Sequence, residues 1–238
     1  MRGPATFFLA LSFSLAAGCA SIDAQPTAAS IRSARWEVVT TPVAGPLPND
    51  AAPAVTVWLR DGASERELPG RYLGALPFDG AVVGLELDGT LRRFVVTDRG
   101  ELQSERIAEH VTSIPIVSPD GAHLAYVVSA DGLTGSLRVL DAMGDREVTT
   151  PLGSIGALAF SPDGARVAFV GVAADGGIAG VWIADARGVD RARCLTNCEL
   201  EAGDDLTRAM PLPADALRVE HQRITWIDSD GVEHEVRR

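Results

Sequence analysis

Carboxylates are the chemically capable side chains that recur most regularly in this sequence. Aspartates in glycine-containing turns stand at Asp120, Asp163, Asp175 and Asp185. Paired carboxylates carry out glycoside hydrolysis, but an aspartate in a turn is already explained by hydrogen bonds to its own backbone. We therefore expect these aspartates to shape turns, and we assign no catalytic residue.

Metal and histidine chemistry also lack a complete set of residues. The segment Asp228-Ser229-Asp230-Gly231 resembles the start of a calcium loop, but the sequence supplies no glutamate at the twelfth position of such a loop. The four histidines are His110, His123, His221 and His234. His221 and His234 flank a predicted hairpin, and no nucleophile stands at a recognisable spacing from any of the four. We expect neither a metal site nor a cofactor.

Charge and composition exclude several classes of protein. The chain has 32 acidic and 21 basic residues, all of the latter arginine, for a formal net charge of −11. This balance argues against binding nucleic acid, which requires a basic surface, and against binding anionic lipid through charge. Hydrophobic residues make up 46% of the chain, too many for a wholly disordered protein.

The first residues read as a targeting signal. Arg2 precedes the uncharged apolar run Phe7–Ala17, which has the length of the apolar core of a signal peptide and is too short to span a bilayer. The segment Leu15–Cys19 resembles the cleavage motif of bacterial lipoproteins. That resemblance implies a signal peptide over residues 1–18 and a diacylated thiol at Cys19. An ordinary secretory signal is the alternative interpretation.

The residues after the cleavage motif predict a tether. Residues 19–33 are mostly small and polar, which favours a flexible segment between lipid and folded domain. In the lipoproteins that this sequence resembles, the residue after the cysteine directs sorting, and Ala20 implies the outer membrane. The expected location is therefore the bacterial cell envelope, lipid-anchored and facing the periplasm.

The cysteine count is consistent with this expected location in the cell envelope. The chain has three cysteines, Cys19, Cys194 and Cys198. If Cys19 carries lipid, Cys194 and Cys198 remain as a pair in an oxidising compartment, where a disulfide persists. Such a bond would close only a short loop and would not hold the fold together. A zinc site needs four ligands, and there is no second cysteine pair.

An internal repeat occupies the remainder of the chain. Ser118–Val127 and Ser161–Val170 match closely at an offset of 43 residues. Glycines at corresponding positions are Gly62, Gly100, Gly144, Gly188 and Gly231, spaced by 38, 44, 44 and 43 residues. We expect five repeats of about 42 residues over residues 34–238.

Each repeat has the pattern of short antiparallel strands. In the fourth copy the apolar runs are Ile155–Phe160, Arg166–Val172, Gly180–Ala184 and Ala192–Leu195. Turns separate these runs, and the aspartate-glycine or equivalent turn residues are Asp79, Gly80, Asp120, Gly121, Asp163 and Gly164. Four strands per repeat predict an all-β fold, a β-propeller of about five four-stranded blades. The first blade is expected to be irregular, because only three of its strands are evident.

The third and fourth copies resemble the TolB-type, WD-repeat-like propeller repeat. The segments that carry the resemblance are Ser161–Gly164, Arg166–Phe169 and Leu195–Asn197. The additional N-terminal domain and sixth blade of TolB are not evident here. The resemblance implies the propeller fold, and we do not infer from it that this chain shares the role of TolB.

Three tryptophans, Trp58, Trp182 and Trp226, are expected at equivalent positions in the third strand of their blades. They would either form an aromatic binding face or pack between blades, and packing is the favoured interpretation.

The leading hypothesis for function is an envelope lipoprotein whose small propeller binds another protein and performs no catalysis. Its basis is an anchor, a tether and a rigid scaffold without a catalytic motif. The alternative is an enzyme or ligand-binding protein that uses the central funnel of the propeller on a glycan or small molecule. The expected partners are an envelope protein and, through the lipid, the membrane.

Changing Cys19→Ser is expected to release the protein from membranes, because a lipoprotein without its acylated thiol loses stable anchoring. Fractionation of cells into soluble and membrane pools measures the effect, with Cys194→Ser as the control that leaves the lipid in place. Continued membrane association of the Cys19 variant would contradict lipidation.

Overall fold

The structure is a computed structural model. It describes residues 29–32, 36–43, 54–62, 64–149, 152–173, 180–196, 217–220, 223–227 and 232–237. Strands and turns make up these residues, and none of them belongs to a helix of the length and apolar character needed to cross a membrane. The signal peptide and Cys19 lie outside the described residues.

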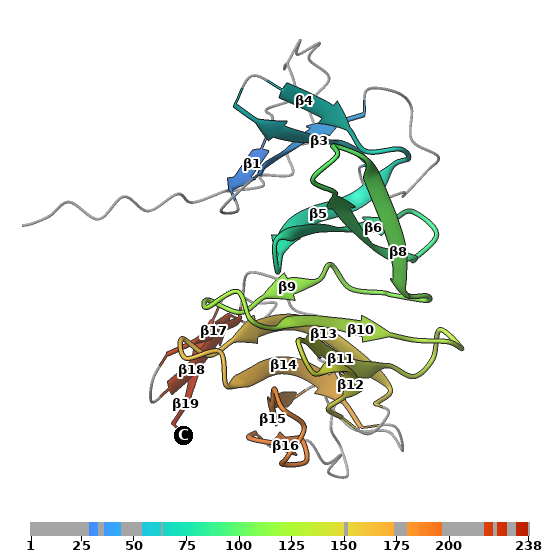
Figure 1. Ribbon diagram of the computed structural model, residues 1–238. Coiled ribbons are helices and arrows are strands. Elements are labelled where there is room, and N and C mark those ends of the chain that lie inside the picture. The colour runs from blue at the N-terminus through green and yellow to red at the C-terminus, as the bar shows by residue number, and fades with distance from the viewer. Residues whose placement is uncertain are drawn as a thin grey trace, which may run out of the picture.

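The strands form five successive units, here called blades 1 to 5 (Figure 1). Blade 1 contains β1 (Ala29–Arg32), β2 (Glu37–Pro42), β3 (Val55–Asp61) and β4 (Ser64–Glu67). Blade 2 contains β5 (Tyr72–Phe78), β6 (Ala81–Glu86), β7 (Leu91–Val96) and β8 (Leu102–Ala108). Blade 3 contains β9 (Ile116–Val117), β10 (Leu124–Val128), β11 (Ser136–Asp141) and β12 (Gly144–Glu147). Blade 4 contains β13 (Ser154–Phe160), β14 (Arg166–Val172), β15 (Gly180–Asp185) and β16 (Arg193–Cys194), and blade 5 contains β17 (Leu217–Val219), β18 (Arg223–Ile227) and β19 (Glu233–Arg237).

Within each blade, neighbouring strands pair in sequence order and run antiparallel. Blades 1 and 2 are joined into one larger sheet by a single residue pair, Val55 of β3 with Tyr72 of β5. The prediction of an all-β fold built from four-stranded antiparallel blades is confirmed, with four such blades and three described strands in blade 5.

The hydrophobic core consists of four layers, each between two neighbouring blades. Val57 and Tyr72 belong to the layer between blades 1 and 2, and Leu85 and Tyr126 to the layer between blades 2 and 3. Two further layers join blade 3 to blade 4 and blade 4 to blade 5. No corresponding layer joins blade 5 to blade 1 among the described residues. Figure 1 shows blade 1 at the top of the view and blade 5 at the lower left, apart from each other.

Blade 1 has a fourth strand that the sequence pattern did not reveal. Residues 29–32 form β1, which pairs with β2 from Ala29 opposite Thr40 to Arg32 opposite Glu37. These four residues fall inside the tether predicted over residues 19–33. The first blade therefore begins earlier in the chain than its apolar pattern suggested.

The strands of blade 5 correspond to those of blade 4 in a different way from the one that the glycine spacing predicts. The β17–β18 hairpin is closed by a hydrogen bond from the Glu220 amide to the Arg223 carbonyl. The β13–β14 hairpin is closed in the same way, from the Ser161 amide to the Arg166 carbonyl. Strand β17 also contacts β13, the first strand of blade 4, as β13 contacts β9, the first strand of blade 3. By this contact, β17 and β18 are the first and second of the strands that the structure describes in blade 5.

This correspondence of strands shows that the predicted equivalence of the three tryptophans is wrong for Trp226. Trp182 lies in β15 and stacks on Phe169 of β14, with ring centroids 6.3 Å apart and an interplanar angle of 13°. Trp226 lies in β18 and stacks on His234 of β19, at 5.3 Å and 15°. Trp226 thus corresponds to Phe169, and His234 to Trp182. The connection that contains Gly231 then follows a second strand, whereas the other four glycines follow a third strand.

Packing between blades accounts for two of the three tryptophans. Trp182 packs against the layer between blades 3 and 4, and its indole nitrogen donates to the Gly171 carbonyl at 3.0 Å. Trp226 packs against the layer between blades 4 and 5. Trp58 alternates along β3 with Val57 and Leu59, which face blade 2, and so lies on the opposite face of blade 1.

The substitution Gly84→Ala is expected to lower the free energy of unfolding by about 1–3 kcal/mol, because it overfills a packed core. A Cβ at Gly84 would lie 2.8 Å from the ring of Tyr72, which is fully buried. Gly156→Ala is the matched control, because a Cβ there meets nothing within 4 Å and the residue also lies in a strand. Urea denaturation measures both, and equal stabilities of the two variants would contradict the packing of blade 2.

Candidate functional site

The aspartate-glycine residues at 79 and 80 join the first two strands of blade 2. Phe78 pairs with Ala81 across a two-residue turn, and both turn residues have positive φ, 48° at Asp79 and 68° at Gly80. Such a turn matches the twist of antiparallel strands and favours Asp or Asn before Gly. The Asp79 carboxylate accepts a hydrogen bond from Arg93 of β7 at 3.1 Å.

The Ser-Pro-Asp-Gly turn of blade 3 is braced by its own side chains. Ser118 Oγ donates to Asp120 Oδ1 at 2.5 Å, and the Ala122 amide donates to the same oxygen at 3.1 Å. Ser118 Oγ also accepts the His123 amide at 2.9 Å. Gly121 has φ 74°, which glycine adopts without a Cβ clash.

The turn of blade 4 repeats this geometry. Ser161 Oγ donates to Asp163 Oδ1 at 2.5 Å and accepts the Arg166 amide at 3.0 Å, and Gly164 has φ 68°. In the blade 3 turn, hydrogen bonds from the Ser118 side chain and the Ala122 amide lower the pKa of Asp120. Both carboxylates accept hydrogen bonds from their own turns, which is a structural role.

One histidine lies beside a carboxylate. His123 Nε2 is 3.6 Å from Asp141 Oδ2, and its ring packs near Phe160. Burial acts to raise the pKa of Asp141, but hydrogen bonds from the Met143 amide and Arg146 outweigh it and lower that pKa. His110 is exposed with φ 57°, and His221 lies outside the described residues.

Cys194 lies in β16 and is disulfide-bonded. Cys198 and Cys19 both lie outside the described residues. The Cys194–Cys198 pairing therefore stays a prediction.

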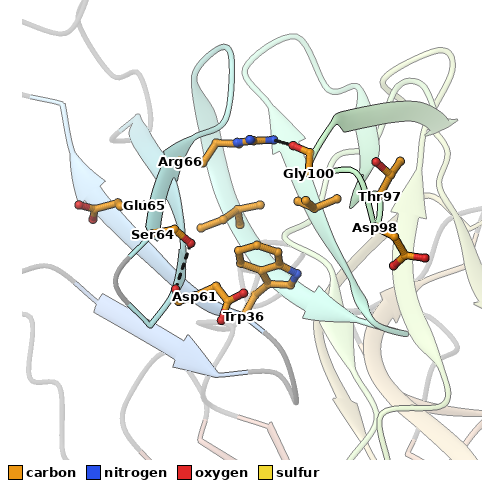
Figure 2. A pocket seen from close by; sticks show the side chains of 10 residues that line it. Trp36, Asp61, Ser64, Glu65, Arg66, Thr97, Asp98 and Gly100 are labelled. Atoms are coloured by element: carbon orange, nitrogen blue, oxygen red, sulfur yellow. Dashed lines mark hydrogen bonds between the residues drawn. The ribbon is translucent and has the colours of Figure 1, made fainter.

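A pocket of about 240 Å³ lies between blades 1 and 2, at the end where their third and fourth strands turn (Figure 2). Its apolar floor consists of Trp36, Leu59 and Val96. The polar rim comes from the β3–β4 hairpin and from the turn between β7 and β8, and its residues are Asp61, Ser64, Glu65, Arg66, Thr97, Asp98 and Gly100. The lining is drawn from these two blades alone, so this pocket is not a central funnel.

Backbone and side-chain hydrogen bonds fix the rim. Arg66 crosses from blade 1 to blade 2, where its Nη1 donates to the Gly100 carbonyl at 2.5 Å. Ser64 Oγ donates to the Asp61 carbonyl at 3.0 Å, and the Glu101 amide donates to Thr97 Oγ1 at 3.1 Å. The rim is therefore a pre-formed frame, as binding pockets usually are.

Figure 2 shows how the pocket is arranged. The Trp36 indole lies in the middle, Asp61 beside it, and Asp98 and Thr97 on the opposite side of the view. Arg66 lies higher in the view than the indole and reaches sideways to Gly100. A surface of this kind can hold the apolar part of a side chain and offer charge at its rim.

Sequence reasoning did not identify this pocket. Trp36 precedes β2, while the rim residues come from the β3–β4 hairpin and from the turn between β7 and β8. The sequence did offer one signal, because Asp61-Gly62 and Asp98-Arg99-Gly100 were recognised as equivalent turns of neighbouring repeats. Equivalent turns of successive blades lie at the same end of the propeller.

Comparisons with known proteins support the fold. No family model and no curated protein matches the sequence. A puromycin-hydrolyzing peptidase from Mycobacterium tuberculosis is similar in structure over 90% of this chain, with a TM-score of 0.56 and 15% sequence identity. TolB from Acinetobacter baumannii is matched over 86% of this chain, with a TM-score of 0.43 and 16% identity.

These similarities concern architecture. The chain spans 36% of the peptidase chain and 52% of the TolB chain. At 15% identity the likeness to the peptidase shows a shared fold and nothing about activity, and the weaker likeness to TolB adds no argument. The resemblance to TolB-type repeats continues to rest on the Ser-Pro-Asp-Gly segments.

Arg66→Met is expected to lower the free energy of unfolding by about 1 kcal/mol, because it removes the hydrogen bond that joins blade 1 to the Gly100 turn. Arg187→Met is the matched control, since Arg187 is exposed in the corresponding turn of blade 4 and no hydrogen bond of its side chain is described. Thermal unfolding compares the two variants. A loss of equal size in both would show that the bond across the rim contributes nothing.

Proposed function

We propose that this protein is a lipid-anchored scaffold of the bacterial cell envelope whose propeller binds another protein. The observation that carries the proposal is the pre-formed pocket between blades 1 and 2. Its apolar floor and polar rim suit an anchoring side chain of a partner, since buried anchors in such pockets dominate protein interfaces.

A rigid frame supports this role. The layer beneath the pocket contains Leu59 and Tyr72, which are 1% and 0% exposed, and Phe94, whose ring meets that of Tyr72 edge-on at 5.9 Å. Close packing of this kind keeps the two blades in one relative position. A partner then binds without the loss of conformational freedom that ordering a flexible site would require.

The direction of the chain supports presentation of the pocket away from an anchor. In β1, Arg32 pairs with Glu37 near the pocket, and Ala29 pairs with Thr40 at the far end of β2. The chain therefore enters blade 1 from the end opposite the pocket. Cys19 lies ten residues before Ala29, which corresponds to at most about 36 Å of extended chain.

The acyl chains at Cys19 and the outer-membrane location are parts of this proposal. A diacylated cysteine anchors a protein stably, whereas a single chain does not. The net charge of −11 gives the propeller no electrostatic attraction to anionic lipid. The lipid would then hold the protein at the membrane while the propeller stays in the periplasm.

A photo-activatable residue in place of Thr97 tests the proposal in intact cells. Thr97 lies at the pocket rim and is partly buried. Illumination is expected to yield a discrete cross-linked product that contains a second protein. Mass spectrometry of the purified product identifies that protein.

The same residue in place of Val189 is the control, because Val189 is 78% exposed and lies just beyond the corresponding turn of blade 4. It is expected to yield no such product. Absence of a product from position 97, or the same product from both positions, would contradict a protein-binding role for the pocket.

A further inference from the structure

The charges at the pocket rim are not equally available. Three carboxylates, Asp61, Glu65 and Asp98, and one guanidinium, Arg66, belong to the rim. Glu65 is paired with Arg60, whose Nη2 lies 2.8 Å from Glu65 Oε1. The Arg66 guanidinium is committed in part to the Gly100 carbonyl.

Asp61 and Asp98 are the available negative charges. Both residues are exposed, and neither carboxylate forms an ion pair or accepts a hydrogen bond within the part of the chain that the structure describes. They come from the corresponding turns of two neighbouring blades. Figure 2 shows them on either side of the Trp36 indole. The mouth of the pocket is therefore negative at two points around an aromatic ring.

The floor suits the stem of a long side chain. Leu59 is 1% exposed, and Trp36 and Val96 are partly buried, so the floor is apolar but open to the rim. Lysine and arginine lie with their methylene stems on apolar surfaces and keep their charged ends in water. Their cations are also attracted to the face of a tryptophan ring within about 6 Å of its centroid.

Size and net charge favour the same occupant. At about 240 Å³ the pocket is below the range of about 300–1,000 Å³ that is usual for drug-sized ligands, which favours a single side chain. The formal charge of −11 attracts a positively charged partner and repels a negatively charged one. An acidic side chain of a partner that paired with Arg66 would be repelled by the two available carboxylates, Asp61 and Asp98.

We propose that the pocket between blades 1 and 2 binds a lysine or arginine side chain of a partner protein. The stem lies on Trp36 and Leu59, and the cationic end lies between Asp61 and Asp98. The inference rests on the proposed protein-binding function and adds the chemistry of the residue that is recognised.

Short peptides test this chemistry directly on the mature protein. The probes are acetyl-Gly-X-Gly-amides in which X is arginine, lysine, norleucine or glutamate, followed through the indole N–H signals in ¹⁵N NMR spectra. The Trp36→Phe variant assigns the Trp36 signal among the four tryptophans. Arginine and lysine peptides are expected to shift this signal saturably, with weaker binding at high salt.

Two double variants separate charge from shape. Asp61→Asn with Asp98→Asn keeps the size of the rim and is expected to weaken binding of the arginine peptide at least tenfold. Glu147→Gln with Asp190→Asn is the control, because it removes the same charge from exposed positions in blades 3 and 4. The control is expected to change the affinity less than twofold.

The remaining outcomes overturn the inference. Equal binding of the norleucine peptide would show a purely apolar pocket, and binding of the glutamate peptide would show an anion site at Arg66. A Trp36 signal that no peptide shifts would show that the pocket takes none of these side chains. Cross-linking from position 97 is independent of these peptides, so a partner captured there would preserve the proposed function with a different recognised residue.

Discussion

Burial of both faces of each blade is the constraint on which this fold depends. In β14, Val167 and Phe169 face blade 3, while Ala168 and Val170 face blade 5. Alternate residues of a strand point to opposite faces, so an inner blade must be apolar at almost every position of its central strands. The sequence RVAFVGV of β14 meets that requirement. An isolated blade would expose both faces, and the blades therefore fold only as a stack of neighbours.

The pocket follows from the same constraint at the place where a layer ends. Strands of blades 1 and 2 diverge into turns beyond Leu59 and Val96, so the apolar layer has no further residues to fill the gap between them. Trp36, which packs against this layer, covers part of the gap and leaves the rest open. Arg66 spans the two turns with one hydrogen bond instead of closing them with apolar contacts. The candidate site is thus the unfilled end of an otherwise packed interface, and its apolar floor is continuous with the core.

Sequence reasoning recovered those features that local hydrogen bonding determines. The turns at Asp120 and Asp163 have the same bonds in the structure because four consecutive residues specify them. It missed β1, since four residues without an apolar pattern pair only because β2 lies beside them. It also misplaced Trp226. Gly231 follows Trp226 at the spacing expected after a third strand, but Trp226 lies in β18, the second described strand of its blade. The pocket was missed because its lining is assembled from turns of two blades, which no local pattern connects.

Blade 5 differs from the inner blades on the face that points away from blade 4. Along β18, Ile224 and Trp226 face blade 4, whereas Arg223 points to the other face and pairs with Glu235, as does Arg237. The same face carries Thr225 and Ile227 where β14 has Ala168 and Val170, and Thr225 is buried while Ile227 is 40% exposed. Burying these ion pairs against another blade would remove their hydration with little return, because desolvation of paired charges often exceeds their attraction. Among the described residues, the ion pairs of Arg223, Glu235 and Arg237 therefore oppose burial of this face, whereas both faces of β14 are apolar and buried.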